Sequence, residues 1–185
     1  MNGNDQSIKG FRPELFAKQA QEAMNGKGLP PVDLWNPDFC GTIDMHIKRD
    51  GSWDYMGTPI TRPAMIKLFS TILRRDDDGE YYLVTPVEKV GIRVDDAPFV
   101  AVEMEQNEGD IIFRTNVDDY VTAGNDHPIR VEINKKTGEP TPYVKVRGRL
   151  EALIARPVFY QLAEYAVKQD GRYGVKSANQ FFPLD

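Results

Sequence analysis

The amino-acid sequence predicts an α+β protein with two related β-rich halves, each carrying a capping helix. Three observations support this class. Short runs of alternating or β-branched residues are separated by Gly, Pro, Asn or Asp turns about 8–12 residues apart, which is typical of antiparallel sheets. Only a few segments have helical periodicity, and they do not alternate with the strands as in a parallel sheet. One group of patterns occurs twice along the chain.

Composition limits the class of protein further. The chain has 185 residues, 41% of them hydrophobic and 28% charged, which suits one or two soluble globular domains. A net charge of −5 argues against a DNA or RNA polymer as partner, because such binding needs a basic face. Cys40 is the single cysteine, so no internal disulfide is expected, and neither a metal site nor a cofactor is predicted.

The beginning of the chain is polar and shows no apolar signal segment. No run approaches the ~18 apolar residues that a membrane span requires. We therefore expect no membrane span and a cytoplasmic location.

The first predicted element is a helix over 13–24, because Phe16 and Ala20 fall on one helical face. The proline-rich segment 28–37 fits neither a helix nor a strand ladder. Alternation over 43–48, the Asp50-Gly51 turn and a returning strand over 53–56 predict a hairpin. A second helix is predicted over 63–75.

Strands dominate the remainder of the predicted structure. They are expected at 81–85, 88–94, 99–105, 111–116, 120–123, 129–134, 143–147 and 150–155. A last helix is predicted over 157–168, followed by a tail whose apolar residues attach it to the core. The predicted organisation is a helical extension over 1–28, an N-terminal half over 29–86 and a C-terminal half over 87–185.

The internal repeat is centred on two Arg-Pro pairs. Arg62-Pro63 and Arg156-Pro157 each open a segment with helical periodicity, and the two arginines stand 94 residues apart (156 − 62). The Asp50-Gly51 turn before the first pair has a counterpart at Thr137-Gly138 before the second. The order strand, glycine turn, strand, Arg-Pro, helix therefore predicts a duplication.

An arginine at a helix start is electrostatically unfavourable, because the N-terminus carries partial positive charge. Two explanations remain open for Arg62 and Arg156. A ligand phosphate or carboxylate compensates them, or a carboxylate of the protein does so. Arg147 either extends the same cationic set or is a solvated residue at a strand end. Trp53 and Tyr55, which share one strand face, either pack in the core or stack on a nucleobase. The candidate ligand-binding residues are thus Arg62, Arg156, Arg147, Trp53 and Tyr55.

Familiar catalytic signatures are absent from the sequence, so no catalytic residue is assigned. A hydrolase acting on a phosphorylated small molecule would have to assemble its site from side chains such as Asp44, His46 and Asp54. This alternative ranks last among the functional hypotheses.

Several long stretches together resemble the bacterial family designated domain of unknown function 1285. They are PPVDLWNPDFCG (30–41), MHIKRDGSWDYMGTPITRP (45–63), LVTPVEKVGIRVDDAPFVAVEM (83–104), FRTNVDD (113–119) and PYVKVRGRLEALIARPVFYQL (142–162). The resemblance implies a duplicated core and a C-terminal half like a pleckstrin-homology fold, with a bent antiparallel sheet. It also implies a role in signal transduction and a nucleotide-based ligand between the halves. It provides no catalytic residues.

Two main functional hypotheses follow from the sequence. The first is a cytoplasmic ligand-binding module in signalling, with a nucleotide-like anion held between the two halves. The second is a protein–protein interaction module without a small ligand, because exposed sheet edges pair readily with a partner strand.

Overall fold

The computed structural model describes residues 10–24 and 28–185. These residues divide into two compact units, unit 1 up to Asp95 and unit 2 from Asp96. This division falls after the boundary expected at residue 86, because the strand Lys89–Val94 pairs within the sheet of unit 1. The helix of the predicted extension over 1–28 packs on another helix of unit 1. Residues 1–9 and 25–27 of that extension lie outside the described residues.

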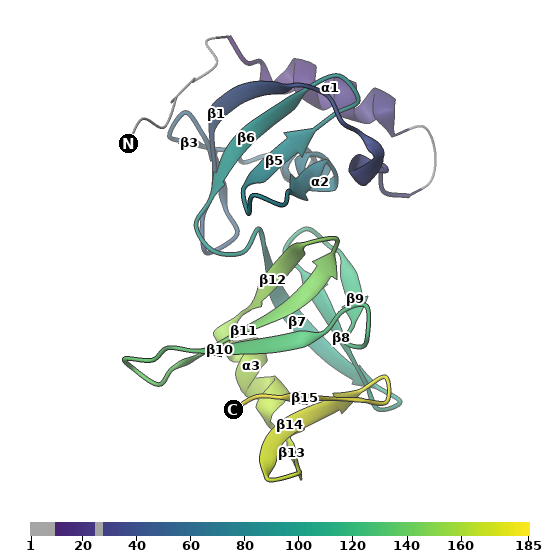
Figure 1. Ribbon diagram of the computed structural model, residues 1–185, viewed down its shortest axis with the longest axis vertical. Coiled ribbons are helices and arrows are strands. Elements are labelled where there is room, and N and C mark those ends of the chain that lie inside the picture. Colours follow the sequence, from purple (N-terminus) through teal and green to yellow (C-terminus); the bar gives the residue numbers. More distant parts are fainter. Residues whose placement is uncertain (1–9, 25–27) are drawn as a thin grey trace. The chain divides into compact units, whose positions relative to one another are not determined.

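Unit 1 combines one curled sheet with two α-helices (Figure 1). Its helical elements are α1 (Pro13–Ala23), the short 3-10 helix η1 (Val32–Leu34) and α2 (Pro63–Thr71). Its strands are β1 (Phe39–Ile47), β2 (Trp53–Tyr55), β3 (Thr58–Pro59), β4 (Leu73–Arg75), β5 (Tyr81–Val84) and β6 (Lys89–Val94). The strand order across the sheet is β3-β2-β1-β6-β5-β4.

Unit 2 contains a second sheet, one α-helix and a smaller sheet formed by the end of the chain. The second sheet consists of β7 (Phe99–Asn107), β8 (Asp110–Thr115), β9 (Tyr120–Thr122), β10 (Ile129–Ile133), β11 (Pro140–Arg147) and β12 (Leu150–Ile154), in the order β10-β11-β12-β7-β8-β9. The helix is α3 (Arg156–Ala163), and the smaller sheet comprises β13 (Val167–Gln169), β14 (Arg172–Ser177) and β15 (Gln180–Pro183).

The two larger sheets have the same topology, which confirms two related halves. Each consists of two three-stranded antiparallel meanders whose inner strands lie side by side in parallel. The parallel pair is β1 with β6 in unit 1 and β7 with β12 in unit 2. Strands β1 to β6 therefore correspond in order to β7 to β12, and the α+β class with two related halves is correct.

The repeat that we identified in the sequence has a different register from this structural duplication. Along the chain, helix α2 comes between β3 and β4, the third and fourth strands of unit 1. Helix α3 instead follows β12, the sixth strand of the large sheet in unit 2. The Asp50-Gly51 turn joins β1 to β2 and corresponds to Glu108-Gly109 between β7 and β8, while Thr137-Gly138 joins β10 to β11. The offset of 94 residues therefore does not relate equivalent positions.

The Arg-Pro pairs reflect how helices begin in this chain. Each α-helix of the described residues starts at such a pair, and Arg12-Pro13 at α1 is the third. Proline suits the first turn because its fixed φ is helical and its missing N–H would be unbonded there. The residue before proline is driven toward extended geometry, and Arg12 (φ −116°) and Arg62 (φ −89°) have it.

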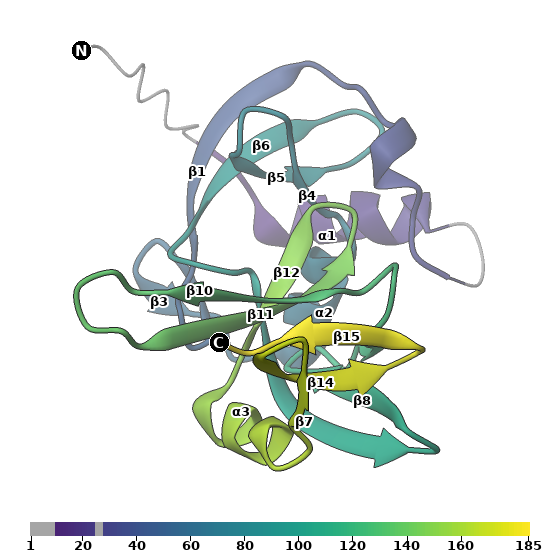
Figure 2. The same cartoon turned by 60° about the horizontal axis from the view of Figure 1, so that its bottom comes forward.

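The C-terminal residues form a sheet that we did not predict. The segment that we expected to be an irregular tail forms β14 and β15. The residues that we expected to form the last turn of the final helix begin β13 instead. A type I′ turn joins β13 to β14, because Asp170 (φ 51°) and Gly171 (φ 84°) both have the positive φ that this turn requires. The buried hydroxyl of Ser177 donates to the Ala123 carbonyl at 2.7 Å and accepts from the Ile111 amide at 2.8 Å, which fixes this sheet beside β8 (Figure 2).

Gly174 allows β14 and β15 to approach closely. A Cβ at this position would lie 2.3 Å from the Phe182 carbonyl oxygen and 2.6 Å from Cζ of Phe181. We expect Gly174→Ala to lower the free energy of unfolding by about 1–3 kcal/mol, because the backbone of β15 has to shift. Urea denaturation is the measurement, and Lys176→Ala on the same strand is the control, with a change within about 0.5 kcal/mol. Equal stability of the two variants would contradict the close approach.

Candidate functional site

Trp53, a candidate for stacking on a ligand, lies in the core of unit 1. Its side chain is 1% exposed, and its ring stacks on Phe69 of α2 with centroids 6.4 Å apart. It pairs with Ile47 across the β1–β2 hairpin, on the face that packs inward. The structure therefore places this indole among core side chains and does not present it to a ligand.

Tyr55 shares the core-facing side of the hairpin but is half-buried at its end. Its hydroxyl donates to the Phe11 carbonyl at 3.1 Å. Its ring packs edge-on against the Phe11 ring, with the two centroids 5.8 Å apart. Burial raises the pKa of this hydroxyl. Tyr55 thus attaches the segment before α1 to the sheet.

Arg62 lies at the start of α2 and is exposed. Its guanidinium is 3.8 Å from Glu14 of α1, and both side chains are largely open to solvent. An exposed pair at this distance contributes little to stability. Glu14 therefore only partly answers the question of which negative charge compensates Arg62.

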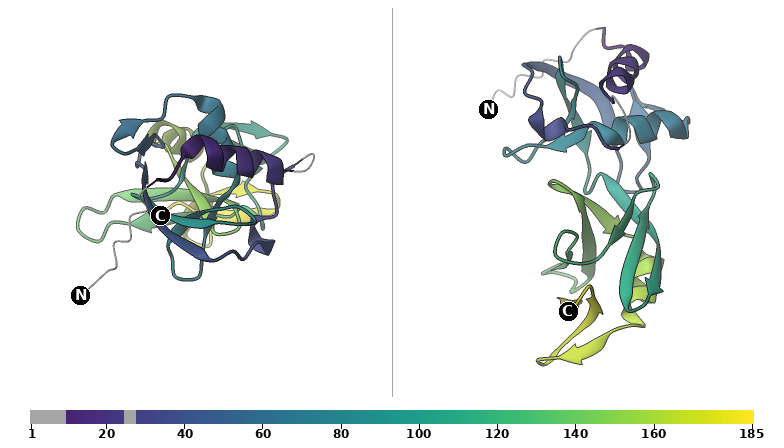
Figure 3. Two further views of the ribbon diagram at one scale, coloured as in Figure 1. Left: turned by 90° about the horizontal axis from the view of Figure 1, so that it is seen from above. Right: turned by 90° about the vertical axis from the view of Figure 1, so that its right-hand side faces the viewer.

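Arg62 also lines a groove between α1 and α2. Figure 3 shows these two neighbouring helices of unit 1 in purple and blue. This α1–α2 groove has a volume of about 680 Å³. Its apolar lining residues are Ala17, Met24, Ala64, Met65 and Leu68, and its polar ones are Gln21, Arg62, Lys67 and Thr71. Within the described part of the chain, the lining contains two cations and no carboxylate.

Lys67 is a lining residue that sequence reasoning missed. It is exposed and forms no ion pair within the described residues. Helical spacing contains the relevant signal, since Ala64, Lys67, Leu68 and Thr71 follow the i, i+3, i+4, i+7 pattern of one face. That face was not singled out in the sequence, because the packing of α1 beside α2 was not predicted.

The other two candidate arginines belong to unit 2 and differ in their surroundings. Arg147 forms an ion pair with Asp119 and lies over the Phe99 ring, with its guanidinium carbon 5.0 Å from the centroid. Arg156 is exposed at the start of α3 and forms no ion pair within the described residues. A protein carboxylate thus compensates Arg147, and the described residues provide none for Arg156.

The side chains considered for a hydrolase share one face of the β1–β2 hairpin. His46 lies directly opposite Asp54 in the strand register. Its Nε2 is 2.6 Å from Asp95, and its Nδ1 is 2.8 Å from Arg93. Asp54 accepts a contact of 2.6 Å from Lys48. His46 and Asp54 therefore have charged partners of their own, and no cluster in the described residues is arranged to hold a metal ion.

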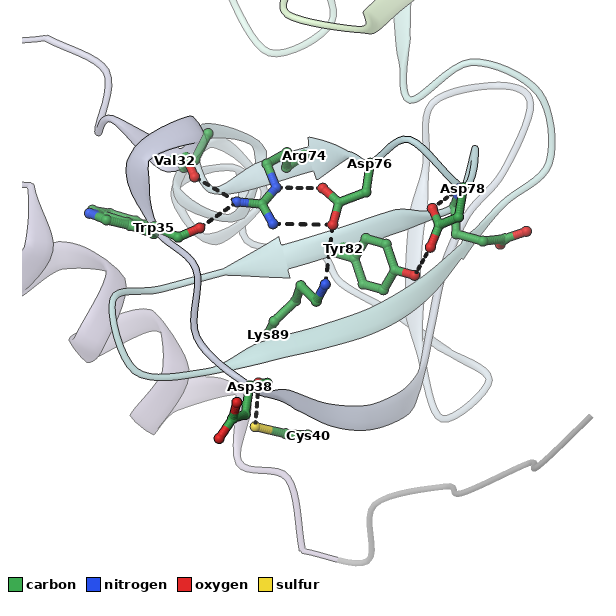
Figure 4. A network of polar contacts seen from close by, with 10 residues as sticks. Val32, Trp35, Asp38, Cys40, Arg74, Asp76, Asp78, Tyr82 and Lys89 are labelled. Atoms are coloured by element: carbon green, nitrogen blue, oxygen red, sulfur yellow. Dashed lines mark hydrogen bonds and ion pairs between the residues drawn. The ribbon is translucent and has the colours of Figure 1, made fainter.

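A polar network around Arg74 fixes the proline-rich segment to the sheet (Figure 4). The guanidinium donates to both carboxylate oxygens of Asp76 at 2.5 and 3.1 Å. It also donates to the carbonyls of Val32 and Trp35 at 2.8 and 2.7 Å. Lys89 reaches Asp76 at 3.2 Å. Because every strong donor has an acceptor within the network, we interpret it as structural.

The Asp76 carboxylate makes stability pH-dependent. Burial raises the pKa of this group, but the hydrogen bonds from Arg74 and Lys89 outweigh it and lower the pKa below the ordinary 3.8. The stabilisation is therefore complete above pH ~4 and is lost as the pH falls through the lowered pKa. We expect the stability difference between wild type and Asp76→Asn to shrink from pH 6 to pH 3 in urea denaturation. Asp33→Asn is the control, and a difference that stays constant with pH would contradict the assignment.

Fold and site together define a class of protein, a duplicated α+β protein with a cation-bearing groove between two helices of one unit. Family models for domain of unknown function DUF1285 match the chain, the N-terminal domain over residues 30–97 and the C-terminal domain over 98–184. The protein belongs to the DUF1285 family.

Two solved structures of the same family are similar to this chain. A DUF1285 family protein from Silicibacter pomeroyi DSS-3 is 53% identical, with a TM-score of 0.82 over 91% of this chain and 93% of that one. A second, from Shewanella baltica OS155, is 27% identical, with a TM-score of 0.52 over 65% of this chain and 90% of that one. A comparison with curated proteins gave no match. None of the helices in the described residues has the length and apolar character to span a membrane.

Proposed function

We propose that this protein is a ligand-binding module and that unit 1 binds a small anion in the α1–α2 groove. The observation that carries the proposal is the combination of Arg62 and Lys67 with a lining free of carboxylates. Arg62 was already a candidate from the sequence, and its place in a groove supports that hypothesis.

The size and lining of the groove are those of a small-molecule site. Such sites occupy about 300–1,000 Å³ and combine apolar walls with a few placed polar groups. The volume of about 680 Å³ falls within this range. Gln21 and Thr71 add neutral hydrogen-bonding groups to the two cations. The arrangement supports reversible binding of one ligand, and the sequence expectation of a cytoplasmic signalling role belongs to the same proposal.

A thermal-shift panel tests the proposal. The probes are AMP, as the nucleotide-like ligand suggested by the sequence, together with inorganic phosphate and alkyl phosphates. A ligand at 100 times its Kd stabilises the folded state by about 2.7 kcal/mol. We expect the double variant Arg62→Ala, Lys67→Ala to lose most of that stabilisation.

Arg12→Ala is the matched control for this experiment. Arg12 also precedes the proline that begins a helix and is also exposed, but it does not line the groove. It is expected to keep the wild-type response. The proposal is wrong if no anion shifts the transition at millimolar concentration, or if the double variant responds like wild type.

A protein–protein interaction module remains the second proposal, favoured by two exposed leucines beside η1. Leu29 is 53% exposed and Leu34 is 82% exposed. Apolar side chains presented this openly are common at contact surfaces. Cross-linking in cells with wild type and Leu34→Glu tests it, and an identical set of cross-linked proteins would count against this surface.

A further inference from the structure

We infer that the ligand of the α1–α2 groove is an anion with an unbranched aliphatic tail, of the alkyl phosphate or fatty carboxylate class. This inference rests on the proposed function and specifies its ligand. It differs from the sequence expectation of a nucleotide-like anion, because the groove and its charges favour a flexible chain over a nucleobase.

The walls of the groove are aliphatic. Met24 and Met65 contribute flexible thioethers, Leu68 contributes a branched chain, and Ala17 and Ala64 contribute only methyl groups. Methionine adapts its shape to irregular apolar partners. Among the residues that the structure describes, no aromatic side chain lines the groove, so they provide no flat face on which a nucleobase stacks. Trp53 and Tyr55, the aromatic candidates from the sequence, are not among the lining residues.

The groove has Arg62 at one end and an uncharged contact at the other, with Lys67 between them along α2. The start of α1 lies beside the start of α2, because Glu14 is 3.8 Å from Arg62. The ends of the helices also lie together, because the Thr71 hydroxyl is 3.7 Å from the Met24 sulfur. Arg62 therefore marks one end of the groove and the Met24–Thr71 contact marks the other.

In the proposed complex, an amphiphilic ligand lies along the groove in a single orientation. The anionic head lies at Arg62, and Lys67 flanks the tail from the rim of α2. The tail follows the helix pair toward Met24, along the nine residues of α2, which span about 14 Å. An elongated chain fills such a groove, whereas a compact inorganic anion reaches only the cationic end.

A chain-length series tests the inference on the full-length protein. Butyl, hexyl and octyl phosphate are titrated by calorimetry below their micelle concentrations, with AMP, inorganic phosphate and octanol as comparison probes. We expect Kd to fall two- to fourfold for each added methylene, as apolar surface leaves water. Octyl phosphate is expected to bind at least tenfold more tightly than either AMP or octanol.

Two pairs of variants locate the binding site. Ala64→Trp fills the groove from an exposed helix position and is expected to abolish the chain-length dependence, while Leu15→Trp, on an exposed position of α1 outside the groove, leaves it unchanged. Arg62→Ala is expected to weaken octyl phosphate at least fivefold, and Arg12→Ala is expected to have no effect.

The outcomes separate the inference from the proposed function. AMP or phosphate could bind as tightly as octyl phosphate, with Arg62→Ala weakening that binding. The inference of an aliphatic tail would then be wrong, and the proposed anion site would stand. If no probe binds, or if Ala64→Trp and Arg62→Ala bind like wild type, both are wrong. Octanol binding as tightly as octyl phosphate would also overturn both, because the anionic head would then contribute nothing.

Discussion

Trp53→Ala is expected to lower the free energy of unfolding by about 3–5 kcal/mol, the usual cost of truncating a large buried aromatic residue. The indole is 1% exposed and stacks on Phe69, which is fully buried. Its removal leaves a cavity between β2 and α2 that neighbouring side chains fill only partly. Equilibrium urea denaturation followed by circular dichroism measures the change.

Two further variants make this prediction specific. Trp53→Phe retains most of the packing and loses a buried ring N–H that has no partner, so we expect a cost of only about 1 kcal/mol. Met56→Ala changes a residue that is 66% exposed on the same hairpin and is expected to stay within about 0.5 kcal/mol. Unchanged stability in Trp53→Ala together with loss of ligand binding would show instead that Trp53 is a stacking residue.

Arg74→Ala is expected to destabilise the protein by about 2–4 kcal/mol, because it leaves three partly buried acceptors without their donor. Asp76 loses its bidentate partner, and the carbonyls of Val32 and Trp35 lose theirs. The effect is local as well as global. Amide hydrogen exchange at Leu34 and Trp35 is expected to accelerate strongly, since their turn is no longer fixed to β4.

Arg75→Ala is the matched control for this network. Arg75 is the next residue in β4, donates one hydrogen bond to the Gly79 carbonyl and lies over the Tyr81 ring. We expect a loss of about 1 kcal/mol and unchanged exchange at Leu34 and Trp35. Arg74→Lys tests geometry, because a lysine preserves the charge but cannot donate to all three acceptors in the same plane. If Arg74→Ala resembles Arg75→Ala, the network does not fix the segment.

Local patterns predicted most strands because each of those segments contains its own evidence. In β8 the alternation places Ile111, Phe113 and Thr115 on the buried face, as the period of two requires. Turn residues between the segments then set the limits of the strands. The α+β class follows from such local rules, whereas the two related halves were predicted from a repeat with a different register from the structural duplication.

Helix ends were predicted less well, because apolar periodicity continues beyond the point where the backbone changes. The helix expected over 63–75 ends at Thr71, and Leu73 instead pairs with Leu83 in the neighbouring strand. Similarly, the last helix ends at Ala163, and Val167 joins β13 opposite Gly174. In both segments pairing with the next strand along the chain prevails over helical periodicity.

Candidate site residues were predicted from residue type, which does not determine burial. An aromatic pair on one strand face suits either ligand stacking or a core, and packing against α2 places Trp53 in the core. Arg147 and Arg62 looked alike in the sequence, yet Asp119 pairs with one and a groove surrounds the other.

The sequence by itself determined the strand pattern, the helix starts at Arg-Pro and membership of the DUF1285 family, because these depend on neighbouring residues and on long matching motifs. Only the tertiary structure decided the register of the duplication, the boundary at Asp95, the C-terminal sheet and the α1–α2 groove. The physical reason is that strand order and helix packing depend on contacts between residues far apart in the chain. Such contacts determine which of several equally amphipathic faces becomes buried and which remains open to a ligand.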